Sequence, residues 1–257
     1  MQPLRWVASG IFIACIPLLL VLTNVRVAAS WERVYDYAFA QYDVVDVTGI
    51  ERPELDRAAR EVIAYFETSE SDELLDIRVQ RGDEEIALFN QREILHMADV
   101  RDLFWLVYRI HEFALVYVVA YVAAVYLWSR ERSMRQLARE GITAGIATVG
   151  LLSVAAVGVM LGFDAIFEQF HILSFSNDFW QLDPRTDRLV QMFPMGFWFD
   201  VTLAVGVLSV IQGGAVALAG LGYIIWLDRR AEARRLSRRR RRGVRTAEVA
   251  PVAEPAE

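Results

Sequence analysis

Residues 104–128, FWLVYRIHEFALVYVVAYVAAVYLW, form an apolar stretch long enough to cross a bilayer as one helix. A transmembrane helix needs roughly 20 mostly apolar residues. Three further stretches meet this condition, at about residues 6–25, 142–163 and 197–227. With 55% hydrophobic residues and a mean hydropathy of +0.28, the 257-residue chain is predicted to be an α-helical polytopic membrane protein with four transmembrane helices.

The positions of the arginines indicate how these helices are oriented. The chain has no lysine, so all 27 of its basic residues are arginines, and 14 of them lie in the connection 129–140 and in the tail after residue 227. Because positive charge is retained on the cytoplasmic side, both segments and both termini are expected there. Next to a membrane span, such a tail favours membrane lipids as partners and not nucleic acid.

This orientation predicts eight segments. In chain order they are transmembrane helix 1 (1–29), an extracytoplasmic cap (30–103), transmembrane helix 2 (104–128), a cytoplasmic loop (129–140), transmembrane helix 3 (141–163), an extracytoplasmic loop with interfacial helices (164–196), transmembrane helix 4 (197–227) and an arginine-rich cytoplasmic tail (228–257). The first segment has an alternative interpretation as a cleaved signal peptide, because Arg5 and an apolar core precede Val27-Ala28-Ala29.

The cap is predicted to be a small α+β unit. An amphipathic helix opens at Arg52-Pro53, with its apolar residues on one face. Residues 76–80 and 85–89 alternate like two strands, joined by a turn at Gly82-Asp83. Residues 42–47 are expected to supply a third strand.

Beyond the cap, the helical period resumes at Gln91 and runs without proline or glycine to Trp128. His96 is therefore expected in the first turns of this helix, at headgroup depth or just outside. Arg92, His96 and Asp99 share one face, because they are spaced by four and three residues. Asp99 is expected to hold one imidazole nitrogen and to fix the tautomer of His96.

A second histidine, His171, lies above the third span, with Asp164 on the same helical face. Asp183-Pro184 is typical of an N-cap followed by the first helical position, so a short helix is predicted from there to Pro194. The aromatic residues between positions 179 and 199 form an expected interfacial belt.

Two of the three histidines therefore lie at one interface. Imidazole is the side chain most able to accept and return a proton near neutral pH, so the pair indicates acid–base chemistry. The sequence has no G-x-S-x-G elbow, no H-E-x-x-H helix and no phosphate-binding glycine loop, and its single cysteine, Cys15, lies inside the first span. The two alternatives to acid–base chemistry are that the histidines only pack at the interface, or that they bind a metal ion together with Asp99 and Asp164.

The third histidine, His111, lies deeper in the second span, beside Arg109 and Glu112. Charged groups at that depth are costly and usually paired. An ion pair between Arg109 and Glu112 is expected, with contact between Arg109 and a lipid phosphate or carbonyl as the alternative.

Three short motifs carry a resemblance to a known family. Phe89-Asn90-x-Arg92-Glu93-x-x-His96-Met97-x-Asp99-Val100 is followed by Phe170-His171-x-x-x-Phe175 and by Trp180-x-x-Asp183-Pro184. In this order and topology the chain resembles the lipoprotein intramolecular transacylase (Lit) family of integral membrane proteins. The resemblance extends from the first span to the fourth.

The resemblance implies a reaction and a place. Enzymes of this kind move the sn-2 acyl chain of a diacylglyceryl-cysteine lipoprotein onto its N-terminal α-amino group and leave a lyso-form lipoprotein. Because ester-to-amide transfer is downhill and intramolecular, no cofactor is expected. The implied location is the bacterial cytoplasmic membrane, with the active site on the extracytoplasmic face and diacylglyceryl-modified lipoproteins as partners.

The resemblance also implies roles for individual residues. The family's two histidines match His96 and His171, which are the expected catalytic residues. His171 is interpreted as the general base and His96 as the proton or hydrogen-bond donor, with the reverse assignment left open. Support for catalysis is expected from Asp99, Arg92 and Asn177, and substrate binding from Asn90, Trp180, Asp183 and Phe175.

Two other classes of function remain open on sequence alone. One is a non-enzymatic membrane sensor or assembly module whose outer cap binds a ligand. The other is a metal-dependent membrane hydrolase that uses the same two histidines.

Overall fold

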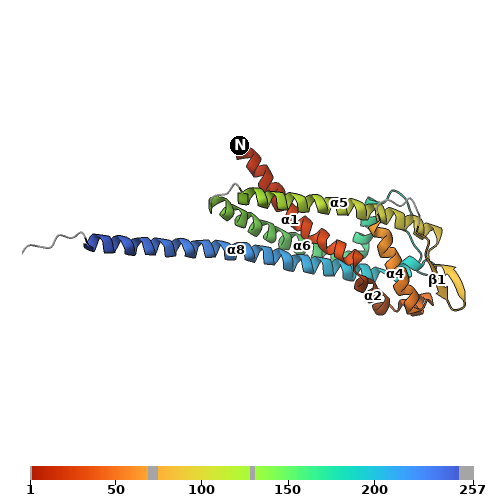
Figure 1. Cartoon of the computed structure of the whole chain (residues 1–257). Helices are drawn as coiled ribbons and strands as arrows, with labels where there is room; N and C mark the ends of the chain where they lie inside the picture. The colour runs from red at the N-terminus through yellow and green to blue at the C-terminus, as the bar shows by residue number, and fades with distance from the viewer. Residues whose placement is uncertain (1, 69–74, 128–130, 249–257) are drawn as a thin grey trace, which may run out of the picture.

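The computed structural model describes residues 2–68, 75–127 and 131–248 (Figure 1). Its elements in chain order are α1 (Gln2–Ser30), α2 (Glu32–Gln41), α3 (Val44–Thr48), α4 (Arg52–Glu67), β1 (Arg78–Arg81), β2 (Glu84–Ala87), α5 (Gln91–Leu127), α6 (Glu131–Ser174), α7 (Arg188–Met192) and α8 (Met195–Glu248). Four of them, α1, α5, α6 and α8, are long and apolar enough to cross a membrane, which confirms the predicted fold class.

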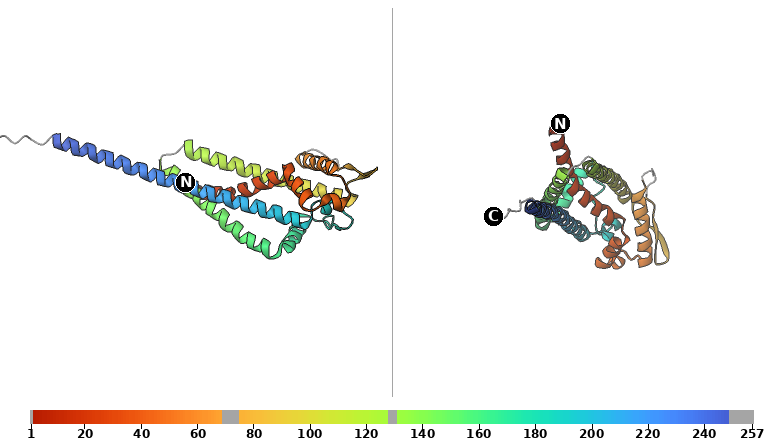
Figure 2. Two further views of the ribbon diagram at one scale, coloured as in Figure 1. Left: turned by 90° about the horizontal axis from the view of Figure 1, so that it is seen from below. Right: turned by 60° about the vertical axis from the view of Figure 1, so that its left-hand side comes forward.

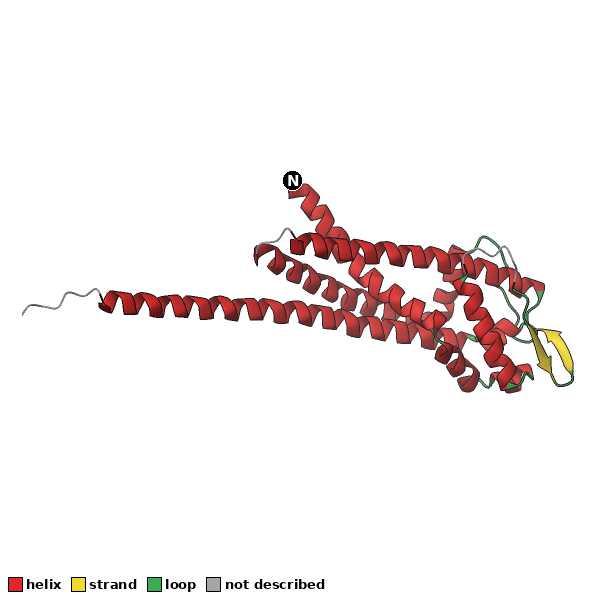
Figure 3. Cartoon of the chain, viewed as in Figure 1, coloured by secondary structure: helices red, strands yellow, loops and turns green. Residues whose placement is uncertain are grey.

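The four long helices lie side by side as a bundle, and the short elements gather at one of its ends (Figure 3). The closest packing is between α6 and α8, where glycines let the two backbones approach. A Cβ atom added to Gly145 would lie 2.4 Å from the carbonyl oxygen of Gly213, and one added to Gly213 would lie 2.8 Å from Thr148. Larger residues at these positions would separate the helices.

Helix α1 is bonded into the bundle by buried polar side chains. The amide nitrogen of Asn24 donates to Ser209 and to Gln212 of α8, each at 2.9 Å. On the other side, Thr23 and His111 of α5 lie within hydrogen-bonding distance at 2.9 Å. These contacts make α1 an integral part of the folded bundle.

The predicted ion pair between Arg109 and Glu112 is wrong. The carboxylate of Glu112 pairs with Arg26 of α1 at 3.5 Å, not with Arg109 of its own helix. Arg26 also lies over the ring of Tyr108, 4.5 Å from its centroid. The cation therefore comes from a neighbouring helix, which a pattern of spacings within one helix does not reveal.

The short elements α2, α3, α4 and the β1–β2 hairpin form the cap, at the right of Figure 1. The amphipathic helix is confirmed, since the predicted apolar face of α4 is buried in the cap core: Leu55, Val62, Ile63 and Phe66. The hairpin is also confirmed. Its two strands are antiparallel, with Val79 opposite Ile86, and Gly82 has φ +64° in the turn.

The predicted third strand at residues 42–47 is wrong, because this stretch forms helix α3. Val44 and Thr48, one helical turn apart, are both buried. Asp43 has φ +49° before the helix and Gly49 has φ +67° after it, so left-handed residues bend the chain at both ends. A run of five residues was too short for its alternation to distinguish strand from helix.

The short helix predicted at Asp183-Pro184 begins later, at Arg188. The backbone closes a separate turn first, because the N–H of Asp187 donates to the carbonyl of Asp183 at 2.8 Å. The predicted end is confirmed, since α7 stops at Met192 before Pro194.

Helix α8 continues well beyond the predicted end of the span at residue 227. It remains helical through the arginine-rich segment to Glu248 and extends past the other helices at the end opposite the cap (Figure 1). Residues 249–257 of the predicted tail lie outside the described part of the chain.

Candidate active site

The two interfacial histidines meet where α5 and α6 come together beneath the cap. The ring centroids of His96 and His171 are 5.9 Å apart, with the ring planes tilted by 36°. Both side chains are buried, with 6% and 7% of their surface exposed. Two imidazoles that are 75 residues apart in sequence thus form one site.

A kink in α6 brings His171 to this position. Gly162 has non-helical dihedral angles, φ −171° and ψ 63°, and interrupts the helix. Figure 2 shows α6 changing direction sharply before its last turns, which fold back toward the start of α5. Without the kink, His171 would continue along the axis of the third span and away from His96.

A backbone carbonyl fixes the tautomer of His171. Its Nδ1 lies 2.7 Å from the carbonyl oxygen of Phe167, one turn earlier. A carbonyl oxygen only accepts hydrogen bonds, so Nδ1 carries the hydrogen. In the neutral ring the lone pair is therefore on Nε2, the nitrogen that can accept a proton from a substrate.

His96 has no such fixed partner. Its Nδ1 is buried and has no hydrogen-bond partner among the described residues. A buried polar atom without a partner costs free energy that a substrate group can recover by bonding to it. Instead of a polar group, the ring of His96 contacts Phe175 edge-on, with centroids 5.2 Å apart.

Aromatic side chains surround the histidine pair. Four rings lie within 6 Å of the His171 ring centroid: Phe167 at 4.3 Å, Trp180 at 5.1 Å, Phe170 at 5.2 Å and Phe175 at 5.6 Å. Such walls exclude water and fit an apolar group. The structure thus brings Phe175 and Trp180, two of the residues predicted to bind substrate, into contact with the pair.

Asp99 has a different partner from the one expected. Its Oδ2 accepts a 2.8 Å hydrogen bond from the side chain of Asn177, while Nδ1 of His96 stays unpartnered. Asn177 in turn accepts from the N–H of Phe179 at 3.0 Å. The guanidinium of Arg92 donates to the carbonyl of Asp178. These predicted supporting residues therefore hold the loop after α6 against α5.

Glu93, which has no predicted role, holds the other side of the site. Only 1% of its surface is exposed, and its carboxylate accepts from the N–H of Leu189 at 2.6 Å and of Asn90 at 2.7 Å. The side chain of Asn90 caps α5 by accepting the N–H of Arg92 and of Glu93. This reciprocal arrangement is a capping box, whose N-x-x-E pattern was visible in the sequence.

Asn90 and Asp183 were predicted to bind substrate, and their observed contacts are to the protein. Asn90 donates from its side chain to Asp187 at 2.9 Å, so it joins α5 to the loop before α7. Asp183 pairs with Arg185 at 2.7 Å. Hydrogen bonds from the side chain and the N–H of Arg185 lower the pKa of Asp183 to about 2.

The alternative interpretation, in which the two histidines bind a metal ion, is not supported by a cluster of ligands among the described residues. Among the described residues, no group of three His, Cys, Asp or Glu side chains is placed to hold a metal ion. Asp164 and Glu168 are exposed, whereas His171 is buried. Of the two candidate carboxylate ligands, Asp99 accepts a hydrogen bond from Asn177 and Asp164 is exposed.

Fold and site together define a multi-pass membrane protein with a buried pair of histidines at one end of its helical bundle. The sequence model of the family described as lipoprotein intramolecular transacylase Lit matches residues 10–198. The matched region contains both histidines and their aromatic neighbours. The chain belongs to this family, and it is a membrane transacylase, an acyltransferase. This membership excludes the non-enzymatic alternative.

Similar proteins extend the comparison over most of the chain. An uncharacterized protein of Aquifex aeolicus (strain VF5) is 28% identical over 222 residues, which cover 85% of this chain and 95% of that protein. The solved structure of membrane-integral Lit from Bacillus cereus has a TM-score of 0.72 at 15% identity and covers 89% of this chain and 99% of its own. A histidine-to-arginine variant of that protein gives a TM-score of 0.68, with coverage of 90% and 96%. The fold is therefore shared.

Proposed function

We propose that the enzyme acts on lipoproteins whose N-terminal cysteine carries a diacylglyceryl group. It transfers the sn-2 acyl chain of that group to the α-amino group of the same cysteine and leaves a lyso-form lipoprotein. The Lit family, to which the chain belongs, supports this assignment of substrate and product.

The observation that carries the proposal is the unequal hydrogen bonding of the two buried imidazoles. His171 uses Nδ1 toward the carbonyl of Phe167 and keeps Nε2 for accepting a proton. Nδ1 of His96 has no hydrogen-bond partner among the described residues, and the centroid of the His96 ring is 5.9 Å from that of the His171 ring. This difference favours His171 as the general base and His96 as the group that donates to the ester.

The proposed steps balance in atoms and protons. An N-terminal ammonium titrates near about 8, so a neutral amine is accessible at physiological pH. Its nitrogen forms a bond to the sn-2 ester carbon as Nε2 of His171 removes one N–H proton. His96 stabilises the carbonyl oxygen or protonates the departing sn-2 oxygen, whose bond to carbon breaks. The amine has lost one proton to His171 and the new hydroxyl has gained one, either from His171 directly or from His96, which then takes the proton back from His171, so both rings end neutral.

The intramolecular reaction needs accurate positioning more than additional reactive groups. We assign Asp99, Asn177 and Arg92 to positioning, because their observed bonds fix the loop that carries Trp180. Phe175 and Trp180 form the apolar wall against which the reacting acyl chain lies. Asn90 and Asp183 remain predicted contacts of the lipoprotein.

The proposed topology places the histidine end of the bundle outside and both termini in the cytoplasm. The arginines of the connection after α5 and of the extended part of α8 support this orientation through the positive-inside rule. The ester groups of a membrane-embedded lipoprotein lie at headgroup height. The end of the bundle beneath the cap is where the histidines would meet them.

The test is expression in a bacterium whose lipoproteins keep a free N-terminus, followed by tandem mass spectrometry of a lipoprotein's N-terminal peptide. The reaction is an isomerisation, so the intact mass stays constant and fragment ions must locate the acyl chain on nitrogen. Loss of reactivity toward an amine-specific reagent gives an independent readout. A free α-amino group on lipoprotein from cells with well-expressed enzyme would refute the assignment.

A further inference from the structure

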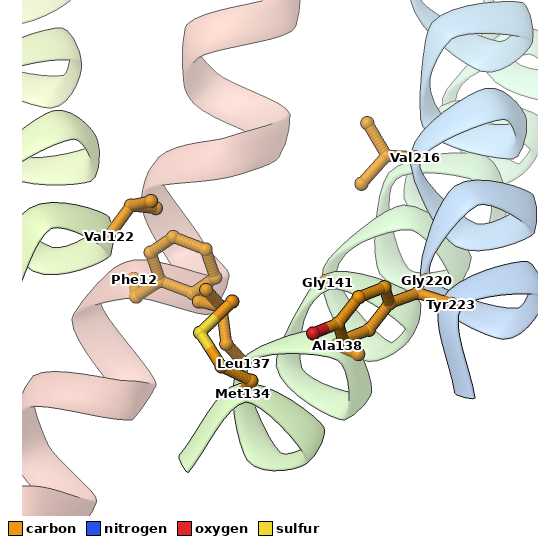
Figure 4. Close-up of a pocket in the computed structure, with 9 residues that line it drawn as sticks. All are labelled: Phe12, Val122, Met134, Leu137, Ala138, Gly141, Val216, Gly220 and Tyr223. Atoms are coloured by element: carbon orange, nitrogen blue, oxygen red, sulfur yellow. The ribbon is translucent and has the colours of Figure 1, made fainter. Parts of the chain in front are cut away.

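A second apolar cavity lies at the end of the bundle opposite the histidines. Its volume is about 280 Å³, and its lining comes from α1, α5, α6 and α8 (Figure 4): Phe12, Val122, Met134, Leu137, Ala138, Gly141, Val216, Gly220 and Tyr223. We propose that this cavity binds an acyl chain of an anionic phospholipid, whose phosphate lies among the arginines at the same end.

The cavity is separate from the active site. His96 is in the second turn of α5, whereas Val122 is near its other end. At 1.5 Å per residue, the two positions are about 39 Å apart along the helix. An acyl chain held here belongs to the opposite membrane leaflet and is not the chain that the histidines transfer.

The wall on the side of α1 is held in a defined shape. Phe12 stacks on Tyr121 of α5, with ring centroids 4.7 Å apart. The hydroxyl of Tyr121 donates to Glu140 at 2.9 Å, and Ser9 of α1 donates to the same carboxylate at 2.6 Å. Glu140 is only 7% exposed. These bonds keep Phe12 from closing over the cavity, so the space is part of the fold.

A glycine keeps the cavity open on the side of α6. A Cβ atom added to Gly141 would find its nearest neighbour, Val216, at 4.0 Å, so a small side chain fits there without a clash. A longer side chain at this position would occupy the space itself. The apolar lining then has one suitable occupant at this depth, which is a hydrocarbon chain.

The charges beside the cavity indicate the headgroup. Arg139 directly follows the lining residue Ala138 on α6. On α8, the ring of the lining residue Tyr223 stacks on that of Trp226, with ring centroids 5.6 Å apart. The guanidinium of Arg230 lies 3.9 Å from the centroid of the Trp226 ring. The side chains of Tyr223, Trp226 and Arg230 therefore follow one another from the cavity toward the polar end of α8.

One of the acidic groups at this end is already partly neutralised. Asp228 pairs with Arg135 at 2.5 Å and lies within electrostatic reach of Arg139. Arg229 and Arg230 add further positive charge beside it. The net positive charge favours a phosphate without a compensating cationic group, as in phosphatidylglycerol, over the zwitterionic headgroup of phosphatidylcholine.

Native mass spectrometry of the detergent-purified full-length protein tests the proposal. The protein is mixed with phosphatidylglycerol or with phosphatidylcholine of the same chains, and the fraction that retains one lipid is measured. We expect wild type to retain phosphatidylglycerol preferentially. Gly141→Leu should lower this retention about tenfold, because displacing two methylenes is worth about that factor.

A matched control separates cavity filling from the gain of a leucine. Gly150 lies on the same helix with nothing within 4 Å of an added Cβ, so Gly150→Leu should retain lipid like wild type. Should Gly141→Leu not fold, Val216→Phe fills the cavity from α8. Full retention of phosphatidylglycerol in a folded cavity-filled variant would overturn the proposal.

Variants of Arg139 and Arg230 form the second part of the lipid-retention experiment. The double variant Arg139→Gln with Arg230→Gln should still retain a lipid but lose the preference for phosphatidylglycerol. If wild type retains the two lipids equally, the anionic headgroup is refuted. Because the readout is lipid retention and not acyl transfer, its outcome is independent of the proposed reaction.

Discussion

The two ends of the bundle each bury a glutamate that forms no ion pair with the described residues, and they use it differently. Glu93, beneath the cap, accepts from backbone N–H groups of Asn90 and Leu189. At the opposite end, Glu140 accepts from side chains only, those of Ser9, Tyr121 and Gln136. The first carboxylate fixes where a loop runs, and the second fixes how helices α1, α5 and α6 pack.

This difference matches what each end has to do. In the proposed mechanism, acyl transfer at the histidines needs the reacting groups placed to within a fraction of an ångström, which agrees with an end built on bonded backbone. The arginine end has no pair of neighbouring histidines among the described residues, and the proposed lipid site there needs only stable packing around an apolar cavity. Substitutions at the two ends should therefore separate activity from stability.

The largest effect is expected from the histidines. His171→Ala or His96→Ala should lower the rate of acyl transfer by about 10² to 10⁴-fold, the usual contribution of a general acid or base. Tandem mass spectrometry of the lipoprotein N-terminus measures the rate. The control is His111→Ala, which removes the remaining histidine and its contact with Thr23. Full activity in either site variant would remove that residue from the mechanism.

Glu93→Ala should come next, because it leaves the partly buried backbone N–H groups of Asn90 and Leu189 without this partner. Each such loss costs about 1–3 kcal/mol. We expect a lower melting temperature together with reduced activity per folded molecule, since the segment from Leu189 is no longer held against α5. Thermal unfolding and transfer assays on the same preparation measure both. Unchanged specific activity would contradict the positioning role.

Glu140→Ala provides the matched change at the other end. It also removes buried hydrogen bonds, so the melting temperature should fall by a comparable amount. The histidine pair lies at the opposite end of the bundle, and the specific activity of the folded fraction should stay at the wild-type level. A selective loss of activity would show that the two ends are coupled.

The sequence was sufficient for features that depend on local periodicity. The four spans follow from long apolar runs, and the buried face of α4 follows from the spacing of Leu55, Val62, Ile63 and Phe66. The pairing of His96 with His171 was predictable because topology placed both helix ends on one side. The Asn90-x-x-Glu93 capping box was readable as well.

Features that depend on distant partners were not predictable. Glu93 bonds to Leu189, 96 residues later, and Glu112 bonds to Arg26 of another helix. The helical spacing of Asp99 and His96 was correct, yet Asp99 bonds to Asn177 across the site. Spacing along one helix shows which side chains share a face, and tertiary packing decides which partner each one takes.

The bond between Asp99 and Asn177 gives a smaller and sharper test. If Asp99 acts only by holding the loop, Asp99→Ala and Asn177→Ala should each lower activity by about 10- to 150-fold, since a hydrogen bond to a charged group is worth about 1.5–3 kcal/mol. The double variant should be no worse than either single one, because both remove the same bond. Additive losses would indicate that Asp99 acts on His96 directly.

The smallest effect is expected at the surface of the same end, for the ion pair between Asp183 and Arg185. Arg185 is 86% exposed, so Arg185→Ala should leave the melting temperature and activity unchanged at neutral pH. The pKa of Asp183 is lowered to about 2. Any stabilisation from the ion pair is therefore fully present above the ordinary carboxyl pKa, and it is lost as the pH falls through the lowered pKa of about 2. Melting curves at pH 3 and pH 7 measure this. A strong loss of activity at pH 7 would instead show that the predicted contact of Asp183 with the lipoprotein depends on Arg185.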